Sequence, residues 1–322
     1  MSQGATTADP SGATPSDGFG RGVLVHVGYH KTGTTWLQRT VFPREAGSFD
    51  LVWKLREVNR LFVDPHALEF NAAAVRAQML PGIEGAFGGG LVPAVSSEEL
   101  SGNPHSGGHG SAEYARRLAE ALPGARILIV VRRQPAMRES VYRQYVKRGG
   151  TLPANRYFRP PPRWFRYRRF RLANWEYDRL VGLYHGLFGA ERVKVLPQEL
   201  LSADPAAFLR EITDFAGARP IASPSVGREN VGLSALSAAL QRRTNRWFHR
   251  DDVNEGAPLS WPRVAAMWRG LDALVLRSVA GPWERRLRRE VGSLCVGRFE
   301  ESNARLAEMT GLDLARFGYA LP

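Results

Sequence analysis

The sequence contains 322 residues, of which 43% are hydrophobic, and its 44 lysines and arginines against 31 aspartates and glutamates give a net charge of +13. This charge favours an anionic ligand, substrate or surface, although a generally basic proteome would give the same balance. The longest apolar runs are far shorter than the roughly 20 residues that a membrane-spanning helix needs, so we expect no transmembrane segment.

Domain organisation and cellular setting follow from length and cysteine content. A chain of this length can bury one large core, so we expect a flexible tail over residues 1–20 and a single domain over residues 21–322. The tail has neither the basic start nor the apolar centre of a secretory signal. Cys295 is the only cysteine, which excludes an internal disulfide and a cysteine-based zinc site and indicates a reducing cytoplasm.

The first predicted elements are a strand, a tight loop and a helix. Residues 22–28, GVLVHVG, are a valine-rich apolar run that stops at a glycine, and residues 34–42, TTWLQRTVF, have the apolar spacing of a helix. The loop nearly matches the Walker A pattern G-x-x-x-x-G-K-[ST], because Gly28 and Gly33 have its spacing. A threonine stands where that pattern has its lysine, and Lys31 lies inside the loop instead.

The composition of this loop suits an anion. Its backbone N–H groups and the positive end of the following helix face the same space. Thr34 and Thr35 add hydroxyl donors, and Lys31 adds a cation. A turn that serves only packing is the alternative, which the combination of two glycines, two threonines and a lysine disfavours. The loop therefore predicts a phosphate-like ligand.

Strands and helices alternate along the rest of the chain. We expect strands near 91–97, 125–131 and 192–197, helices near 111–122, 135–148 and 204–216, and a mostly helical part after Gly227. This alternation predicts an α/β fold, with a central parallel sheet covered by helices on both faces and a helical C-terminal part packed on it. Ligands of such sheets bind at the carboxyl ends of the strands, where the glycine loop, Ser96–Glu99 and Arg132 would meet.

The end of the strand at 127–131 distinguishes two classes of phosphate site. It is followed by Arg132 and Arg133, whereas an NTPase usually places an acid at the end of a neighbouring strand to hold Mg²⁺. Arginine there repels a metal ion and attracts a second phosphate. The sequence therefore favours a ligand with two anionic groups, and no metal, over Mg-ATP.

Two segments resemble landmarks of a known family, the sulfotransferases that use 3′-phosphoadenosine 5′-phosphosulfate (PAPS). HKTGTTW, residues 30–36, resembles the family's 5′-phosphosulfate loop, in which the lysine also lies inside the loop. VVRRQPAMRESVYRQY resembles its 3′-phosphate segment, because Ser140 follows the strand-ending Arg132 by eight residues. The resemblance extends from about Val23 to Tyr319. It implies a P-loop NTPase-like sulfotransferase fold of the bacterial type.

One departure concerns the arginine of the second segment. The family commonly has proline two residues after it, whereas Pro135 is three residues after Arg132 and two after Arg133. Either arginine is therefore a candidate for the 3′-phosphate contact, and we favour Arg132.

The resemblance implies transfer of a sulfuryl group from PAPS, as co-substrate, to an acceptor hydroxyl or amine. It assigns donor binding, without a metal, to His30, Lys31, Thr32, Gly33, Thr34, Thr35, Trp36, Arg132 and Ser140. Negative charge builds on the leaving phosphate oxygen, so a cation there lowers the barrier, and Lys31 is the candidate. Trp36 either stacks on the adenine, as its family counterpart does, or packs in the core.

The acceptor needs a general base. Family members use a histidine or a glutamate near the end of a strand close to the sulfate, and SSEELSG, residues 96–102, occupies a similar place. A carboxylate beside an anionic donor has a raised pKa and is a better base, so we predict Glu98 in this role, with Glu99 and His105 as alternatives. A purely structural role is also open, in which a serine caps a helix whose first turn is acidic.

Two further segments have several interpretations. Residues 155–171, NRYFRPPPRWFRYRRFR, interleave aromatic residues with arginines, a composition that fits a lid over the ligands, an interaction surface or a solvated basic face. Residues 227–234, GRENVGLS, resemble a segment that closes over the bisphosphate product, and are otherwise a loop before a helix.

The two phosphate motifs favour a sulfotransferase over its competitors. The alternatives are a P-loop kinase-like phosphotransferase and a basic nucleic-acid-binding protein built around residues 155–171. For the favoured function we expect an acceptor among carbohydrates, glycolipids and small metabolites, and no nucleic-acid partner. Acceptor pockets are built from variable loops, which carry no sequence code.

Overall fold

The computed structural model describes residues 19–159, 170–222, 232–250, 254 and 256–322. The strands are β1 (Leu24–Gly28), β2 (Phe49–Trp53), β3 (Val92–Ser96), β4 (Arg126–Val131) and β5 (Val193–Pro197). The helices are α1 (Thr34–Trp36), α2 (Leu55–Val58), α3 (Ala72–Gly88), α4 (Ser111–Ala121), α5 (Gln134–Lys147), α6 (Ala154–Phe158), α7 (Tyr177–Phe188), α8 (Gln198–Ala203), α9 (Pro205–Ala216), α10 (Ala235–Phe248), α11 (Pro262–Leu271), α12 (Arg277–Val279), α13 (Gly281–Ser293) and α14 (Glu300–Thr310). Short segments of other helical types include η1 (Leu37–Val41), η4 (Glu98–Ser101) and η8 (Asp272–Leu276).

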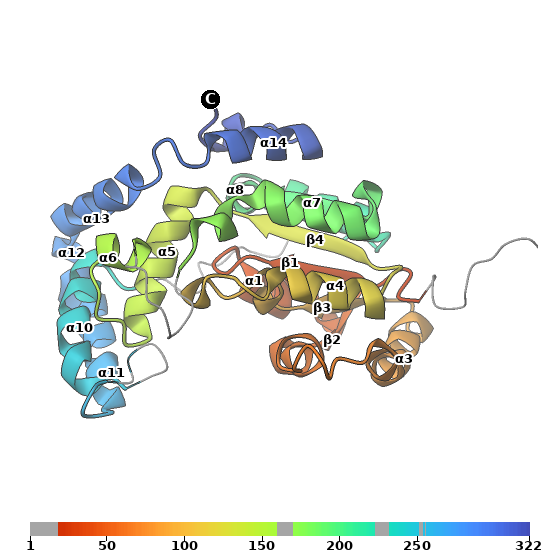
Figure 1. Ribbon diagram of the computed structural model, residues 1–322, viewed down its shortest axis with the longest axis horizontal. Coiled ribbons are helices and arrows are strands. Elements are labelled where there is room, and N and C mark those ends of the chain that lie inside the picture. The colour runs from red at the N-terminus through yellow and green to blue at the C-terminus, as the bar shows by residue number, and fades with distance from the viewer. Residues whose placement is uncertain (1–18, 160–169, 223–231, 251–253, 255) are drawn as a thin grey trace, which may run out of the picture.

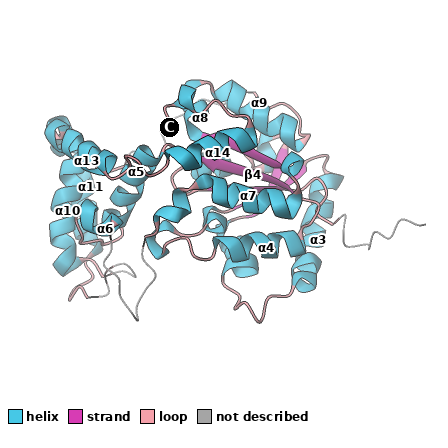
Figure 2. Ribbon diagram, turned by 45° about the horizontal axis from the view of Figure 1, so that its top comes forward, coloured by secondary structure: helices cyan, strands magenta, loops and turns pink. Residues whose placement is uncertain are grey.

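The five strands form one parallel sheet in the order β2-β3-β1-β4-β5. The chain builds β2 and β3 on one side of β1 and then β4 and β5 on the other. This reversal makes the carboxyl end of β1 a topological switch point, the place where open α/β sheets bind ligands. Figure 2 shows the strands enclosed by helices, so the predicted α/β fold with a central parallel sheet is confirmed.

Alternation of side chains along β1 and β4 builds a core on each face of the sheet. Val25 of β1 and Ile129 of β4 point into one apolar cluster, which α3, α4 and α7 cover. Leu24 and Leu128 point into a second cluster, which α1, η1 and α9 cover. Strands buried on both faces read as continuous apolar runs, and this is why RILIVV carries no polar residue after its first position.

Most of the C-terminal helices do not lie on the sheet, in contrast to the expectation from the sequence. We call α10 to α13, residues 235–293, the helical arm. The arm packs on α5 and α6 and stands beside the sheet at one end of the molecule (Figure 1). Only α14 returns, where it packs on α7, the helix that covers one face of the sheet. The arm therefore adds a wall to the ligand edge of the sheet, and α14 adds an outer layer.

Phe19 and Gly20, the last two residues of the predicted tail, make described contacts. Residues 1–18 lie outside the described residues. Phe19 packs against the core, and its carbonyl oxygen accepts a hydrogen bond from the backbone N–H of Gly124 at 2.9 Å. No helix within the described parts of the chain has both the length and the apolar character needed to cross a bilayer.

Candidate active site

A cleft of about 1430 Å³ opens where the carboxyl ends of β1 and β4 meet the first residues of α5. Among the residues predicted from the sequence, its lining contains His30, Lys31, Gly33, Thr34, Thr35, Trp36, Glu98, Arg132 and Ser140. The helical arm supplies the opposite wall through side chains that include His249, Arg277 and Glu284. Residues from distant parts of the chain therefore meet in one space, as the parallel topology requires.

The glycine loop has an unusual backbone. Lys31 has φ 71° and is the one non-glycine residue with positive φ in the described ranges, and Gly33 has φ 91°. Left-handed residues of this kind occur in turns that collect N–H groups around anions. Gly28 is required for a different reason, because a Cβ there would lie 2.7 Å from the ring of His26 and 2.8 Å from Oγ1 of Thr34.

Arg132 is tied to this loop. Its Nη1 donates a hydrogen bond to the backbone carbonyl of Lys31 at 3.0 Å, and its own carbonyl accepts one from the Tyr177 hydroxyl at 2.7 Å. Arg133 also lines the cleft, but its Nε lies 3.5 Å from Oε1 of Glu199 and its side chain is more exposed. Of the two arginines, Arg132 is the one held against the anion-binding loop.

Two buried donors at the start of α1 have no hydrogen-bond partner among the described residues. They are Oγ1 of Thr34 and Nε1 of Trp36. Such groups are costly to leave unpaired, and in native sites they mark the place of a ligand or an ordered water. The neighbouring Thr32 is different, because its hydroxyl donates to the carbonyl of Tyr29 inside the core and the residue does not line the cleft.

Burial in the cleft shifts the pKa values of Lys31 and Glu98 in opposite directions. Desolvation by the cleft walls lowers the pKa of Lys31, and Lys147 and Arg132 lower it further, while Glu98 raises it. Desolvation raises the pKa of Glu98 above its ordinary value, while Lys31 and Arg148 oppose the rise. A carboxylate with a raised pKa beside a cation fits a general base next to an electrostatic stabiliser.

The two alternative bases lie behind this surface. His105 shares a hydrogen bond between its Nδ1 and the hydroxyl of Tyr157 at 2.6 Å, and Oε1 of Glu99 accepts one from Asn103. Neither residue is among those that line the cleft. His30 lines the cleft and also approaches Glu99, with its Nε2 3.6 Å from Oε1 of Glu99. Burial lowers the pKa of His30 to about 3 and that of His105 to about 4, so both rings are neutral near pH 7.

One face of α5 contributes residues that the sequence analysis missed. Gln144, Lys147 and Arg148 line the cleft together with Ser140. Gln144 follows Ser140 by four residues and Lys147 follows Gln144 by three, which places all three on the same side of a helix, and this periodicity was the available signal. Neither Lys147 nor Arg148 forms an ion pair with an acid in the described ranges, and the positive charge of Arg148 lowers the pKa of Glu98.

Charges on the wall between α5 and the helical arm are compensated. Arg143 donates to Glu139 and to Glu284, and Nε of Arg288 lies 3.7 Å from Oε2 of Glu139. Glu284 also accepts a hydrogen bond from the backbone N–H of Ala235 at 2.8 Å, which fixes the start of α10. This network joins α13 to α5 and holds the arm at the cleft.

Two predicted segments extend outside the described residues. These are positions 160–169 of the aromatic and arginine-rich stretch and positions 227–231 of GRENVGLS. At the edge of the second, Gly232 and Leu233 line the cleft. In the described ranges no group of three or more histidine, cysteine, aspartate and glutamate side chains is placed to hold a metal ion.

Comparison with solved structures identifies the architecture. A sulfotransferase from Alicyclobacillus acidocaldarius aligns over 91% of this chain and 97% of its own, with a TM-score of 0.52 and 18% identity. The chain has the sulfotransferase fold. A sulfotransferase domain from the curacin biosynthetic pathway aligns over 94% of this chain and 99% of its own, at 12% identity and a TM-score of 0.39. No protein-family model and no curated protein sequence matches the chain.

Proposed function

We propose that this protein transfers the sulfuryl group of PAPS to a hydroxyl or amine of a carbohydrate, glycolipid or small metabolite and releases adenosine 3′,5′-bisphosphate. The observation that carries the proposal is the joint lining of one cleft by the glycine loop, Arg132, Ser140 and Glu98. The loop offers donors and a cation to one anionic group, Arg132 and Ser140 offer donors to a second, and Glu98 offers a base. The fold shared with a sulfotransferase supports the same reading.

The residues present suit this donor. Thr34 has a buried hydroxyl with no protein partner and Trp36 has a buried indole N–H with none, and both lie at the end of the cleft where the loop begins α1. In the proposal the loop N–H groups and the threonines hold the 5′-phosphate, and the edge of Trp36 contacts the adenine. Trp36 is 6% exposed and also packs in the core, so the two roles weighed for it are compatible.

In the proposed reaction the acceptor oxygen or nitrogen attacks sulfur and its proton passes to the carboxylate of Glu98. The bond between sulfur and the bridging phosphate oxygen breaks, and the electron pair stays on that oxygen. The Lys31 ammonium stabilises the developing charge, which is worth most in a site shielded from water. Glu98 is half-buried and has a raised pKa, so it holds the proton better than an exposed glutamate does.

A P-loop kinase-like phosphotransferase is the competing enzyme. Besides Arg132 after β4, the other neighbour of β1 ends at Ser96, whose hydroxyl pairs with Nδ1 of His26 at 2.8 Å and accepts from Gln38 at 3.1 Å. Arg132 therefore carries the argument against a Mg-ATP site, and Glu98, two residues beyond β3, lies where the Lys31 cation acts on it.

The proposed location of the protein is a reducing cytoplasm. Its single cysteine, Cys295, is buried and free, which supports this location.

Transfer of label tests the proposal. The purified protein is incubated with PAPS labelled with ³⁵S and an extract of small molecules, glycans and lipids from its native cells. We expect ³⁵S in an organic product in the presence of wild-type protein and far less with Lys31→Ala. Transfer of ³²P from γ-labelled ATP under the same conditions, without transfer of ³⁵S, would favour the phosphotransferase.

A further inference from the structure

The outer side of the helical arm carries an apolar stripe. From α11 through η8 to α12, large apolar side chains remain exposed at positions 3, 4 or 1 residues apart. Their exposed fractions are Met267 48%, Leu271 39%, Leu274 81%, Val275 56% and Val279 53%. Exposed apolar residues that follow one another along one helix form a contiguous patch, and such patches mark interaction sites.

The orientation of this helical stretch is fixed by its inner side. Val264, Trp268, Asp272 and Leu276 follow one another every four residues and are buried or half-buried. Nε1 of Trp268 donates to Oγ1 of Thr244 in α10 at 2.9 Å. Buried Asp272 accepts from the backbone N–H of Ser234 at 3.1 Å. The inner side is therefore held by Trp268 and Asp272, and the stretch carries apolar side chains on its exposed side as well, unlike an ordinary surface helix with a polar outer face.

Three tryptophans of the same arm are also exposed. Trp247 is 61% exposed near the end of α10, Trp261 is 51% exposed just before α11, and Trp283 is 43% exposed in α13. Leu259, between the first two, is 53% exposed. Tryptophan is enriched at membrane interfaces because its ring is apolar while its N–H remains polar.

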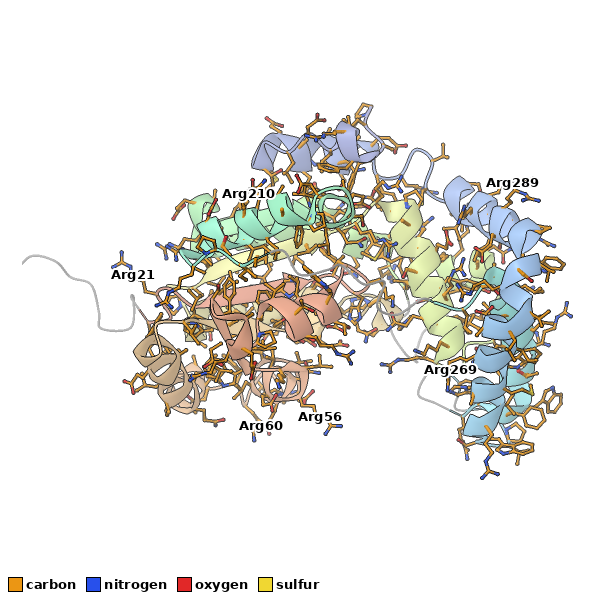
Figure 3. All side chains as sticks on the ribbon, turned by 180° about the vertical axis from the view of Figure 1, so that it is seen from behind. Arg21, Arg56, Arg60, Arg210, Arg269 and Arg289 are labelled. Carbon is orange, nitrogen blue, oxygen red and sulfur yellow. The ribbon has the colours of Figure 1, made fainter. Side chains whose placement is uncertain are left out.

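The arm also carries exposed basic residues. Arg263, Arg269, Arg285, Arg286 and Arg289 are exposed, and none has an ion-pair partner in the described part of the chain. Figure 3 labels two of them, Arg269 and Arg289, on the arm. A second copy of the chain would bring uncompensated arginines together across a twofold interface, whereas a surface of lipid phosphates would neutralise them.

We propose that the outer side of the arm, from Trp261 to Arg289, binds the surface of a membrane that contains anionic lipids. The stripe and the tryptophans enter the boundary between headgroups and acyl chains, and the arginines contact lipid phosphates. The arm lies at one end of the molecule (Figure 1). Its side chains also form a wall of the cleft. Binding there places the cleft beside the membrane surface. The proposal requires no particular chemistry in the cleft.

Co-sedimentation with vesicles tests it. Full-length protein is mixed with vesicles of phosphatidylcholine alone or with 30% phosphatidylglycerol at 0.1 M salt. We expect at least tenfold stronger partitioning onto the anionic vesicles and loss of most binding at 0.5 M salt. The variant Arg285→Gln/Arg286→Gln/Arg289→Gln is expected to bind more weakly by roughly fivefold per arginine.

A pair of charge insertions separates the stripe from general effects. Leu274→Glu is expected to weaken binding at least tenfold. Leu68→Glu is the matched control, because Leu68 is 91% exposed but lies before α3, outside the arm; it should leave binding unchanged. Thermal unfolding followed by circular dichroism checks that both variants fold. Equal partitioning of the two variants, or no preference for anionic vesicles, overturns the proposal. So does a wild-type dimer in light scattering that Leu274→Glu dissociates.

Discussion

Arg132 and Lys31 are 101 positions apart in the chain, and the guanidinium of the first donates to the backbone carbonyl of the second at 3.0 Å. The contact exists because β1 and β4 are parallel neighbours whose carboxyl ends coincide. It fixes the loop that bears the candidate cation to the strand end that bears the candidate second anion site. In the proposed reaction, this hydrogen bond holds the glycine loop and Arg132 in fixed positions relative to each other within one ligand site.

Arg132 is expected to matter more than its neighbour for binding adenosine 3′,5′-bisphosphate. Arg132→Lys keeps the charge but loses the planar fork that suits phosphate, so we expect the dissociation constant to rise about tenfold or more. Arg133→Lys is the matched control, because that side chain is already paired with Glu199. Titration calorimetry measures both, and a larger loss in Arg133→Lys would move the phosphate contact to Arg133.

Glu98→Gln is expected to separate binding from turnover. The amide cannot accept the acceptor's proton, so kcat should fall by about 10²- to 10⁴-fold, while bisphosphate affinity changes little. Glu99→Gln and His105→Asn should retain most activity, because neither residue lines the cleft. Steady-state kinetics with one acceptor decides among them. An active Glu98→Gln enzyme would assign the base to one of the other two.

The pH dependence of turnover is expected to follow the charges around Glu98. A base must be deprotonated, so kcat/KM rises with pH through the pKa of this carboxyl, which burial raises and which Lys31 and Arg148 pull down. Arg148→Gln removes one of these cations, and the acidic limb of the profile should move to higher pH. Arg288 is a cleft cation that is already paired with Glu139, so Arg288→Gln should leave the acidic limb of the profile in place. A limb that moves to lower pH in Arg148→Gln would contradict this assignment.

Two threonines of the loop are expected to respond in opposite ways to the same substitution. Thr34→Val removes a buried hydroxyl without a partner, so the free energy of unfolding of the unliganded protein should rise by about 1 kcal/mol, while bisphosphate binding weakens. Thr32→Val removes the donor to the Tyr29 carbonyl and should lower the free energy of unfolding by about 1 to 2 kcal/mol. Chemical denaturation measures both values. Destabilisation by Thr34→Val would mean that its hydroxyl is satisfied without a ligand.

The sequence predicted the parts of the fold whose signals are local. The glycine loop, the apolar run of β4 and the capped helix α9 each carry their signal within a few residues. Asp204 accepts from the N–H of Ala207 at the start of α9, and Gly217 ends it in the left-handed region. These elements could be predicted because their start and stop signals lie in neighbouring residues and need no distant contact.

Elements fixed by distant contacts were not predicted. β2 is a five-residue edge strand that depends on pairing with β3, and α3 contains Pro81 and lacks a clear apolar face. The arm stands beside the sheet because Glu284 bonds to Arg143 of α5 and to the N–H of Ala235, partners far apart in sequence. Within the cleft, the helical spacing of Lys147 from Ser140 was a local signal, but only the placement of α5 shows that Lys147 and Arg148 line the cleft.

The proposed function requires that the cleft bind a ligand with two anionic groups, and a thermal-shift comparison of two nucleotides tests this most directly. Adenosine 3′,5′-bisphosphate at a hundred times its dissociation constant should add about 2.7 kcal/mol to the free energy of unfolding. Lys31→Ala and Arg132→Lys should reduce the shift, and Mg-ATP should give a much smaller one. A shift with Mg-ATP and none with the bisphosphate would contradict the account.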